Sequence, residues 1–143
     1  MTTAEENKET VRTFVEQAFN EGNMDAVDEY VAEDFVRHDP AAEDVRGVDE
    51  YKEFVKMNRT AFPDYHESIE SMSAEDDTVM YRWILHGTQE GEIMGVEPTG
   101  KSVEINGMVE MRLEDGKIAE MWGTFDALGM LEQLDAVPEQ IKE

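Results

Sequence analysis

Cysteine is absent from this 143-residue chain, which excludes disulfide bonds and thiolate chemistry. Only three histidines are present, so a dedicated zinc site is not expected. No stretch approaches the length and apolarity of a membrane span, and no basic segment followed by an apolar one indicates a signal peptide. We therefore expect a cytoplasmic protein that holds no metal.

Basic residues are also scarce. The chain has 12 Lys and Arg and 35 Asp and Glu, which gives a formal net charge of −23. Such a field repels phosphate, so nucleic acid and anionic membranes are not expected as partners. Self-repulsion of this size destabilises a compact chain in dilute buffer, but it fades at molar salt, where the Debye length is about 3 Å. The charge favours a salt-adapted intracellular protein. The alternative is an ordinary acidic protein whose charge only aids solubility.

The N-terminal part of the chain is patterned for helices. Residues 3–6 have the form of a capping box, and apolar side chains recur three and four apart through residues 11–19. A second apolar helix face is predicted for residues 24–31, and a third around residues 51–58 that ends before Pro63. The segment between the second and third helices is expected to be a short extended piece followed by a loop.

After Pro63 the period changes from helical to alternating, which predicts strands over residues 65–72, 78–88 and 101–113. Residues 89–100, rich in glycine, are expected to form a long loop. Helices followed by a mainly antiparallel sheet indicate an α+β fold, and residues 1–143 are expected to form a single domain.

Asp115-Gly116 predicts a two-residue hairpin turn. If the strands pair outward from this turn without interruption, Trp122 and Asp126 lie on the apolar, inward face of the last strand. A β-bulge at Gly107 or Gly123 would reverse that orientation.

Asp126 has two interpretations. It can cap the helix predicted after it, because aspartate is a preferred N-cap residue. It can also act as a general acid or base, because a carboxylate among apolar groups has a raised pKa and exchanges protons near neutral pH. Lone histidines such as His38 are more often structural than catalytic. Arg82 and Arg112 are expected on the surface as counter-charges.

The chain resembles the SnoaL-like polyketide cyclases of the NTF2-like superfamily over about residues 11–134. The resemblance rests on Phe35-Val36-Arg37-His38-Asp39-Pro40 and on two glycine-containing segments, residues 87–91 and 95–101. It rests also on Gly116-Lys117-Ile118-Ala119-Glu120-Met121-Trp122 leading to Asp126.

The resemblance implies a cone-shaped barrel in which three N-terminal helices pack on a curved, mainly antiparallel sheet around a deep apolar pocket. It further implies a homodimer formed through the sheet, and an acid/base role for Asp126 in an intramolecular aldol closure that needs no metal or cofactor. One departure is Gln89, which stands where many relatives carry histidine. Gln89 cannot titrate, although its amide could donate a hydrogen bond to a carbonyl oxygen.

The leading hypothesis is a cyclase or isomerase that acts on an apolar, carbonyl-containing small molecule by cofactor-free acid/base catalysis. The expected site comprises Asp126 as the catalytic residue and five substrate-binding residues: His38, Gln89, Trp122, Trp83 and Met108. One alternative is a non-catalytic module that binds a small apolar ligand. A hydrolase of the limonene-epoxide type is less favoured, because it needs an aspartate–arginine–aspartate cluster inside the pocket and Arg112 is predicted to point outward.

Overall fold

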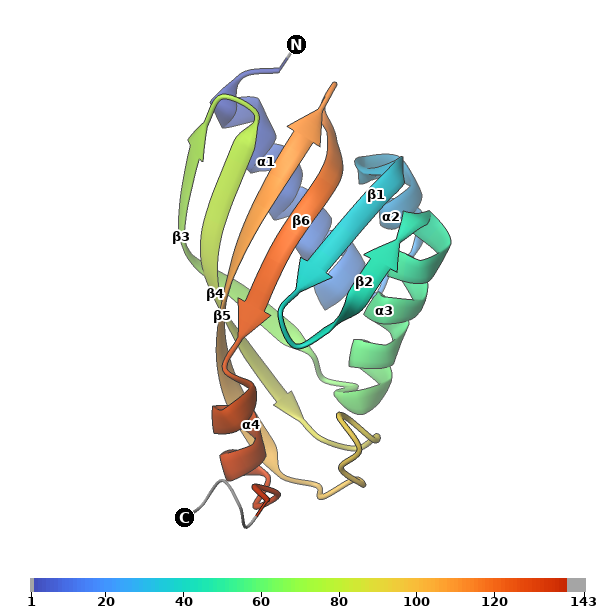
Figure 1. Ribbon diagram of the computed structural model, residues 1–143, viewed down its shortest axis with the longest axis vertical. Coiled ribbons are helices and arrows are strands. Elements are labelled where there is room, and N and C mark those ends of the chain that lie inside the picture. The colour runs from blue at the N-terminus through green and yellow to red at the C-terminus, as the bar shows by residue number, and fades with distance from the viewer. Residues whose placement is uncertain (1, 139–143) are drawn as a thin grey trace.

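A six-stranded curved sheet wraps around the helices in the computed structural model, which describes residues 2–138 (Figure 1). The helical elements are α1 (Ala4–Phe14), the π-helical turn η1 (Val15–Asn20), α2 (Asp25–Tyr30), α3 (Gly47–Ala61) and α4 (Ala127–Gln133). The strands are β1 (Val31–Asp39), β2 (Ala42–Arg46), β3 (His66–Glu75), β4 (Thr78–Thr88), β5 (Ser102–Glu114) and β6 (Lys117–Phe125). No helix in this part of the chain is long and apolar enough to cross a membrane.

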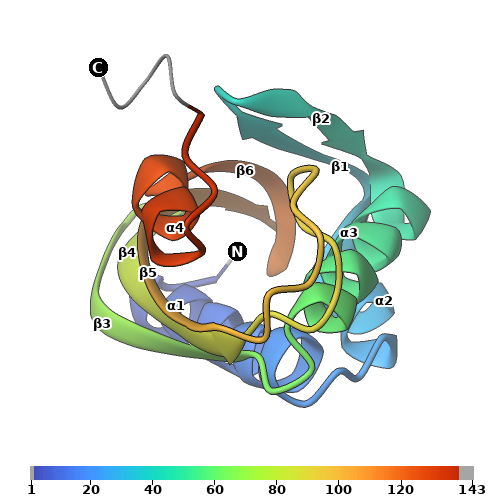
Figure 2. The same ribbon diagram turned by 90° about the horizontal axis from the view of Figure 1, so that it is seen from below.

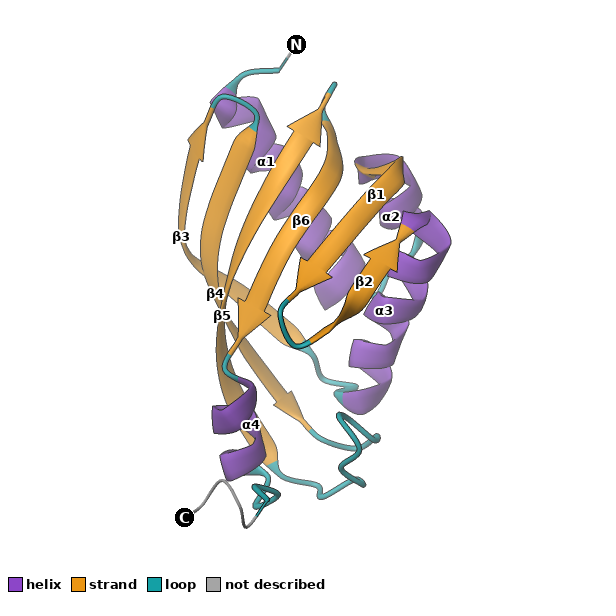
Figure 3. Ribbon diagram, in the orientation of Figure 1, coloured by secondary structure: helices purple, strands orange, loops and turns teal. Residues whose placement is uncertain are grey.

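The strand order is β2-β1-β6-β5-β4-β3, and only the β1/β6 pair is parallel. Seen from below, the sheet curls around an interior that α1 and α3 close (Figure 2). Figure 3 shows helices on one side of the sheet and α4 beyond the end of β6. The predicted α+β class and mainly antiparallel sheet are confirmed.

The first helix begins as its sequence predicts. The Thr3 hydroxyl accepts a hydrogen bond from the Glu6 backbone N–H at 3.1 Å, and the Glu6 carboxylate accepts one from the Thr3 N–H at 3.0 Å. The periodic apolar face is buried, but the helix changes to a π-helical turn after Phe14. Such turns often occur at functional sites because they redirect side chains. Here the turn carries Phe19, which lines the interior cavity, and Asn20, which bonds to the backbone of Glu67.

Strand β2 was not predicted, since residues 41–46 were expected to form a loop. The strand pairs with β1 through Val36↔Arg46 and Arg37↔Val45. Four of its five residues are exposed, so no alternation of apolar and polar side chains signals it in the sequence. It forms the edge of the sheet.

The inward orientation predicted for Trp122 and Asp126 is wrong. The hairpin turn forms, with positive φ at both Asp115 and Gly116, and Leu113 pairs with Ile118. The next pair is Arg112↔Glu120, so one residue of β6 is left unpaired in a bulge beside the turn, not at either glycine considered above.

That bulge exchanges the two faces of β6. Ile118 and Ala119 are both buried, and the residues that face inward beyond them are Met121, Gly123 and Phe125. Trp122, Thr124 and Asp126 are exposed. The alternation expected over residues 78–88 and 101–113 is present in β4 and β5 as alternating buried and exposed side chains, and no bulge interrupts the pairing between these two strands.

Candidate functional site

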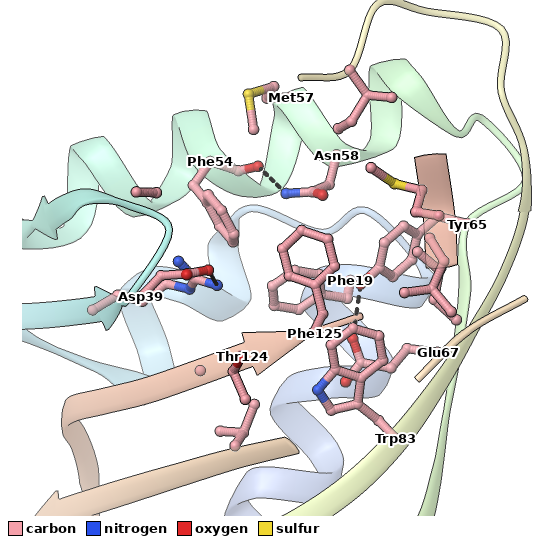
Figure 4. Close-up of a pocket in the computed structure, with 18 of the residues that line it drawn as sticks. Phe19, Asp39, Phe54, Met57, Asn58, Tyr65, Glu67, Trp83, Thr124 and Phe125 are labelled. Carbon is pink, nitrogen blue, oxygen red and sulfur yellow. Dashed lines mark hydrogen bonds and ion pairs between the residues drawn. The ribbon is translucent and has the colours of Figure 1, made fainter. Parts of the chain in front are cut away.

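The concave face of the sheet, together with η1 and α3, encloses a cavity of about 200 Å³ (Figure 4). Its walls are mainly aromatic and aliphatic, with contributions from Phe19, Phe54, Phe62, Trp83 and Phe125. Its ionisable side chains come from three strands: Arg37 and Asp39 of β1, Glu67 of β3 and Tyr81 of β4, with Tyr65 just before β3. The cavity therefore combines an apolar body with a few polar groups, as ligand sites usually do.

Glu67, like Asp39, is a buried carboxyl group of this cavity, and 7% of its surface is exposed. The Tyr65 hydroxyl donates a hydrogen bond of 2.8 Å to its Oε1, drawn in Figure 4. Burial raises the pKa of Glu67 to about 7, and the Tyr65 hydrogen bond opposes that rise. A carboxyl group with such a pKa can exchange protons at neutral pH.

The π-helical turn fixes the backbone of Glu67. The Asn20 side chain accepts from the Glu67 N–H at 2.7 Å and donates to the Glu67 carbonyl at 2.9 Å. Arg59 of α3 holds the end of the turn by donating to the carbonyls of Phe19 and Asn20. Because backbone and carboxylate each have partners, Glu67 is held in one orientation.

Arg37 and Asp39 form the other charged group of the cavity. Arg37 Nη2 lies 3.4 Å from Asp39 Oδ2, while Asp39 Oδ1 accepts a hydrogen bond from the Ala41 N–H at 2.8 Å. The guanidinium carbon lies 4.3 Å from the centroid of the Phe54 ring, a cation–π contact. Arg37 Nε is buried and has no partner among the described residues.

Of the predicted substrate-binding residues, only Trp83 lines this cavity. His38, Trp122 and Met108 instead lie together at a more open recess of about 700 Å³ on the outer face of the sheet. The bulge accounts for Trp122, whereas His38 lies on the outer face because its neighbours Arg37 and Asp39 take the inward positions of β1.

His38, which borders the outer recess, is the centre of a polar network. Its Nε2 lies 2.7 Å from Glu120 and its Nδ1 lies 3.1 Å from Asp44. The hydrogen bond with Glu120 raises the pKa of His38, and the same bond lowers the pKa of Glu120. The rings of His38 and Trp122 lie 5.5 Å apart.

Asp126 is exposed and lines neither cavity nor recess. Its Oδ1 accepts a hydrogen bond from the Gly129 N–H at 2.8 Å, so it is the N-cap of α4. The capping interpretation is confirmed, and the catalytic role of Asp126 stays a prediction.

Gln89 is fully buried and holds the loop that follows β4. Its Nε2 donates to the carbonyls of Gly91 and Val96, each at 3.0 Å, and its Oε1 accepts from both the N–H and the hydroxyl of Thr99. Both amide hydrogens are therefore used, and none is left for a ligand carbonyl.

The arginine cluster of an epoxide hydrolase is not formed by the arginines considered from the sequence. Arg112 lies near Glu120 and Glu114, at 3.4 and 3.3 Å, on the outer face. Inside the cavity, Arg37 pairs with a single carboxylate, Asp39. Within residues 2–138, no three histidine or acidic side chains are grouped closely enough to hold a metal ion.

Sequence reasoning missed Arg37 and Glu67 as site residues, although a signal existed for both. Glu67 is two residues from Tyr65, and Arg37 is two residues from Phe35. Each therefore shares the face of a buried aromatic residue in a strand. A charged residue in phase with core residues is a candidate for a buried functional group.

The chain is similar to known proteins both in sequence and in structure. The family model of the SnoaL-like polyketide cyclase matches residues 9–134. A provisionally assigned SnoaL-like polyketide cyclase from Jannaschia sp. CCS1 is similar in structure at a TM-score of 0.88 and 25% identity, over 96% of this chain and 97% of that one. A provisionally assigned polyketide cyclase from Acidithiobacillus ferrooxidans has a TM-score of 0.82 and 30% identity, over 96% and 100% of the two chains.

A third similar structure is AclR from Streptomyces galilaeus, provisionally described as a hydroxylase, with a TM-score of 0.83 and 28% identity over 95% of this chain and 100% of that one. No curated protein matches the chain.

Proposed function

The chain belongs to the SnoaL-like polyketide cyclase family, and on that premise we propose that it cyclises or isomerises a small, apolar, carbonyl-containing molecule by proton transfer, without a cofactor. The observation that carries the proposal is Glu67, a carboxyl group buried in the wall of an apolar cavity with a pKa raised to about 7. Two relatives provisionally described as polyketide cyclases support the reaction class.

The proposed chemistry uses one carboxyl group twice. The Glu67 carboxylate removes a proton from the carbon next to a substrate carbonyl, giving an enolate and a neutral Glu67. In a cyclisation the enolate carbon attacks a second carbonyl of the same molecule, a carbon–carbon bond forms, and Glu67 returns the proton to the new alkoxide. In an isomerisation the proton returns to another carbon.

The surroundings of Glu67 support this double use. A pKa close to the working pH lets both the charged and the neutral form be populated, which is the condition for efficient acid/base catalysis. The Tyr65 hydroxyl holds the carboxyl group in place, and the Asn20 side chain holds the backbone of Glu67. The aromatic walls bring the reacting carbons of a folded apolar substrate together.

A hydrogen-exchange assay tests the proposal without the natural substrate. The enzyme is incubated with 2-tetralone in D2O at molar KCl, and deuteration beside the carbonyl is followed by NMR. We expect exchange above the buffer rate that increases with pH through a midpoint of about 7. Glu67→Gln should slow it about 10²–10⁴-fold, the usual contribution of a general base. The matched control is Glu70→Gln, which removes an exposed carboxylate from the same strand.

The same assay decides between Glu67 and Asp126. Asp126→Asn should leave exchange close to that of the unmodified protein, because Asp126 lies outside the cavity. If Asp126→Asn abolishes exchange and Glu67→Gln does not, the assignment to Glu67 is wrong and the sequence-based one is right. Tetralone that binds without exchange would favour the alternative, a non-catalytic ligand-binding module.

We also propose that two copies associate through the outer face of the sheet. Met80, Met108 and Trp122 are 53%, 59% and 40% exposed there, and all three border the outer recess. Met108→Glu should shift the protein to a monomer in light scattering, and a monomeric unmodified protein would contradict the proposal.

A further inference from the structure

We infer that Arg37 binds the carbonyl oxygen of the substrate and stabilises the negative charge that develops on it, so that the substrates are ketones or esters with an enolisable carbon. The inference rests on the proposed function, because Arg37 stabilises the charge that the substrate oxygen gains when Glu67 removes a proton. It assigns a substrate contact to a residue that was not considered from the sequence.

The bonding of Arg37 is incomplete for a buried guanidinium. The side chain is 8% exposed and presents five N–H donors. Its one carboxylate contact, Nη2 to Asp39 Oδ2, measures 3.4 Å, longer than the roughly 2.7–2.9 Å of a strong charged hydrogen bond. Nε has no partner among the described residues. A buried donor without a partner is unfavourable, and a hydrogen bond to a ligand oxygen would remove that cost.

The neighbours of Arg37 leave room for such an oxygen. Phe54 covers one side of the guanidinium with its ring, at 4.3 Å. On β6 the neighbour is Gly123, and a Cβ atom there would lie 3.3 Å from Nη2. Ala41 and Ala42 are the small residues of the adjacent cavity wall. A larger side chain at position 123 would occupy the space beside the guanidinium.

Charge balance favours a neutral carbonyl over a carboxylate as the ligand. Arg37 is already balanced by Asp39, and Glu67 adds a further negative charge when it ionises. A carboxylate ligand would therefore bring a surplus of negative charge into an apolar cavity. A ketone or ester brings none. When Glu67 takes the proton, one negative charge moves from its carboxylate to the substrate oxygen, and a guanidinium placed at that oxygen stabilises it without reorganisation.

Binding of 4-nitrophenol tests the inference independently of turnover. The phenolate oxygen mimics the enolate oxygen, and its absorption band moves to longer wavelength on ionisation. We expect the bound phenol to ionise at lower pH than the free phenol. In Arg37→Met the bound phenol should ionise at the same pH as free phenol or higher, and tetralone exchange should fall about 10²–10³-fold. A shift that persists in Arg37→Met, or no shift with the unmodified protein, would overturn the inference.

Two further variants keep the test decisive. Arg37→Met leaves Asp39 buried without its cation, which can prevent folding. The double variant with Asp39→Asn removes both charges and should fold, and it too should lose the nitrophenol shift. Glu67→Gln should keep the shift while losing exchange. If instead Glu67→Gln exchanges normally and Arg37→Met loses the shift, the role of Glu67 fails while oxygen binding by Arg37 stands.

Discussion

Replacing Glu67 with glutamine should change how the stability of the protein depends on pH. Glu67 has a pKa of about 7 in the fold, against 4.5 for an unperturbed glutamate. The folded protein therefore binds more protons than the unfolded chain between these values, and the free energy of unfolding falls as the pH increases through this range. Glutamine has a shape similar to that of glutamate and does not titrate. The free energy of unfolding of the variant therefore does not fall in this way as the pH increases.

The magnitude follows from the pKa difference. A shift from 4.5 to about 7 corresponds to roughly 3 kcal/mol when the carboxyl group is fully ionised, at about 1.4 kcal/mol for each pKa unit. Most of this develops between pH 5 and pH 8. The stability of Glu67→Gln relative to the unmodified protein should therefore increase by about 2–3 kcal/mol between those two pH values.

Urea unfolding at pH 5 and pH 8, both at molar KCl, measures the difference. High salt screens the surface carboxylates but has little effect on a buried group. Glu70→Gln is the control, because it removes the same charge from an exposed position of β3. If Glu67→Gln follows the control within about 0.5 kcal/mol at both pH values, the usual scale of surface substitutions, the carboxyl group is not desolvated and the reasoning is refuted.

Further expectations concern the sheet, the cap, the outer network and the surface charge. Gly107→Ala should destabilise the protein by about 1–3 kcal/mol in urea unfolding, because the added methyl group meets the ring of Trp83; a neutral effect would mean that the ring moves freely. Asp126→Ala should destabilise the protein by about 1 kcal/mol, because it removes the N-cap of α4, and it should keep tetralone exchange. Loss of exchange without loss of stability would show that Asp126 is catalytic and is not needed as a cap. NMR titration should give His38 a pKa above 6.5 that falls towards this value in Glu120→Gln; an unchanged pKa would exclude Glu120 as the cause. The urea concentration at the midpoint of unfolding should increase between low salt and molar KCl, because salt screens the repulsion of a net charge of −23. A midpoint that does not change with salt would argue against salt adaptation.

Most of the secondary structure could be predicted from periodicity and turn chemistry. The capping box at Thr3, the alternation along β4 and β5 and the Asp115-Gly116 turn are local patterns, and each forms as expected. Strand β2 could not be predicted, because an exposed edge strand carries no such pattern. The bulge in β6 could not be predicted either, because Ile118-Ala119 reads as two ordinary strand residues and no glycine marks the extra one.

The site was harder to predict than the fold for a related reason. Assigning Trp122 and Asp126 to the interior depended on counting residues from a turn, so one unpaired residue reversed the result. Gln89 was expected at a ligand because it replaces a histidine in the family pattern, yet its amide closes a loop. Trp83 lies in the cavity because the strand that carries it pairs with β5 without a bulge, and its contact with a substrate stays a prediction.

The bulge beside the β5–β6 turn also bears on how this scaffold could diversify. If the unpaired residue of β6 instead paired with Arg112, every later residue of β6 would move one position along β5, and Trp122 would face inward opposite Val109 in place of Gly123. The part of the cavity next to Arg37 would then acquire an indole ring where it now has no side chain. Loss of one bulge at a hairpin is thus a route by which a chain of this fold could exchange a whole wall of its cavity in one step, without any substitution in the wall itself.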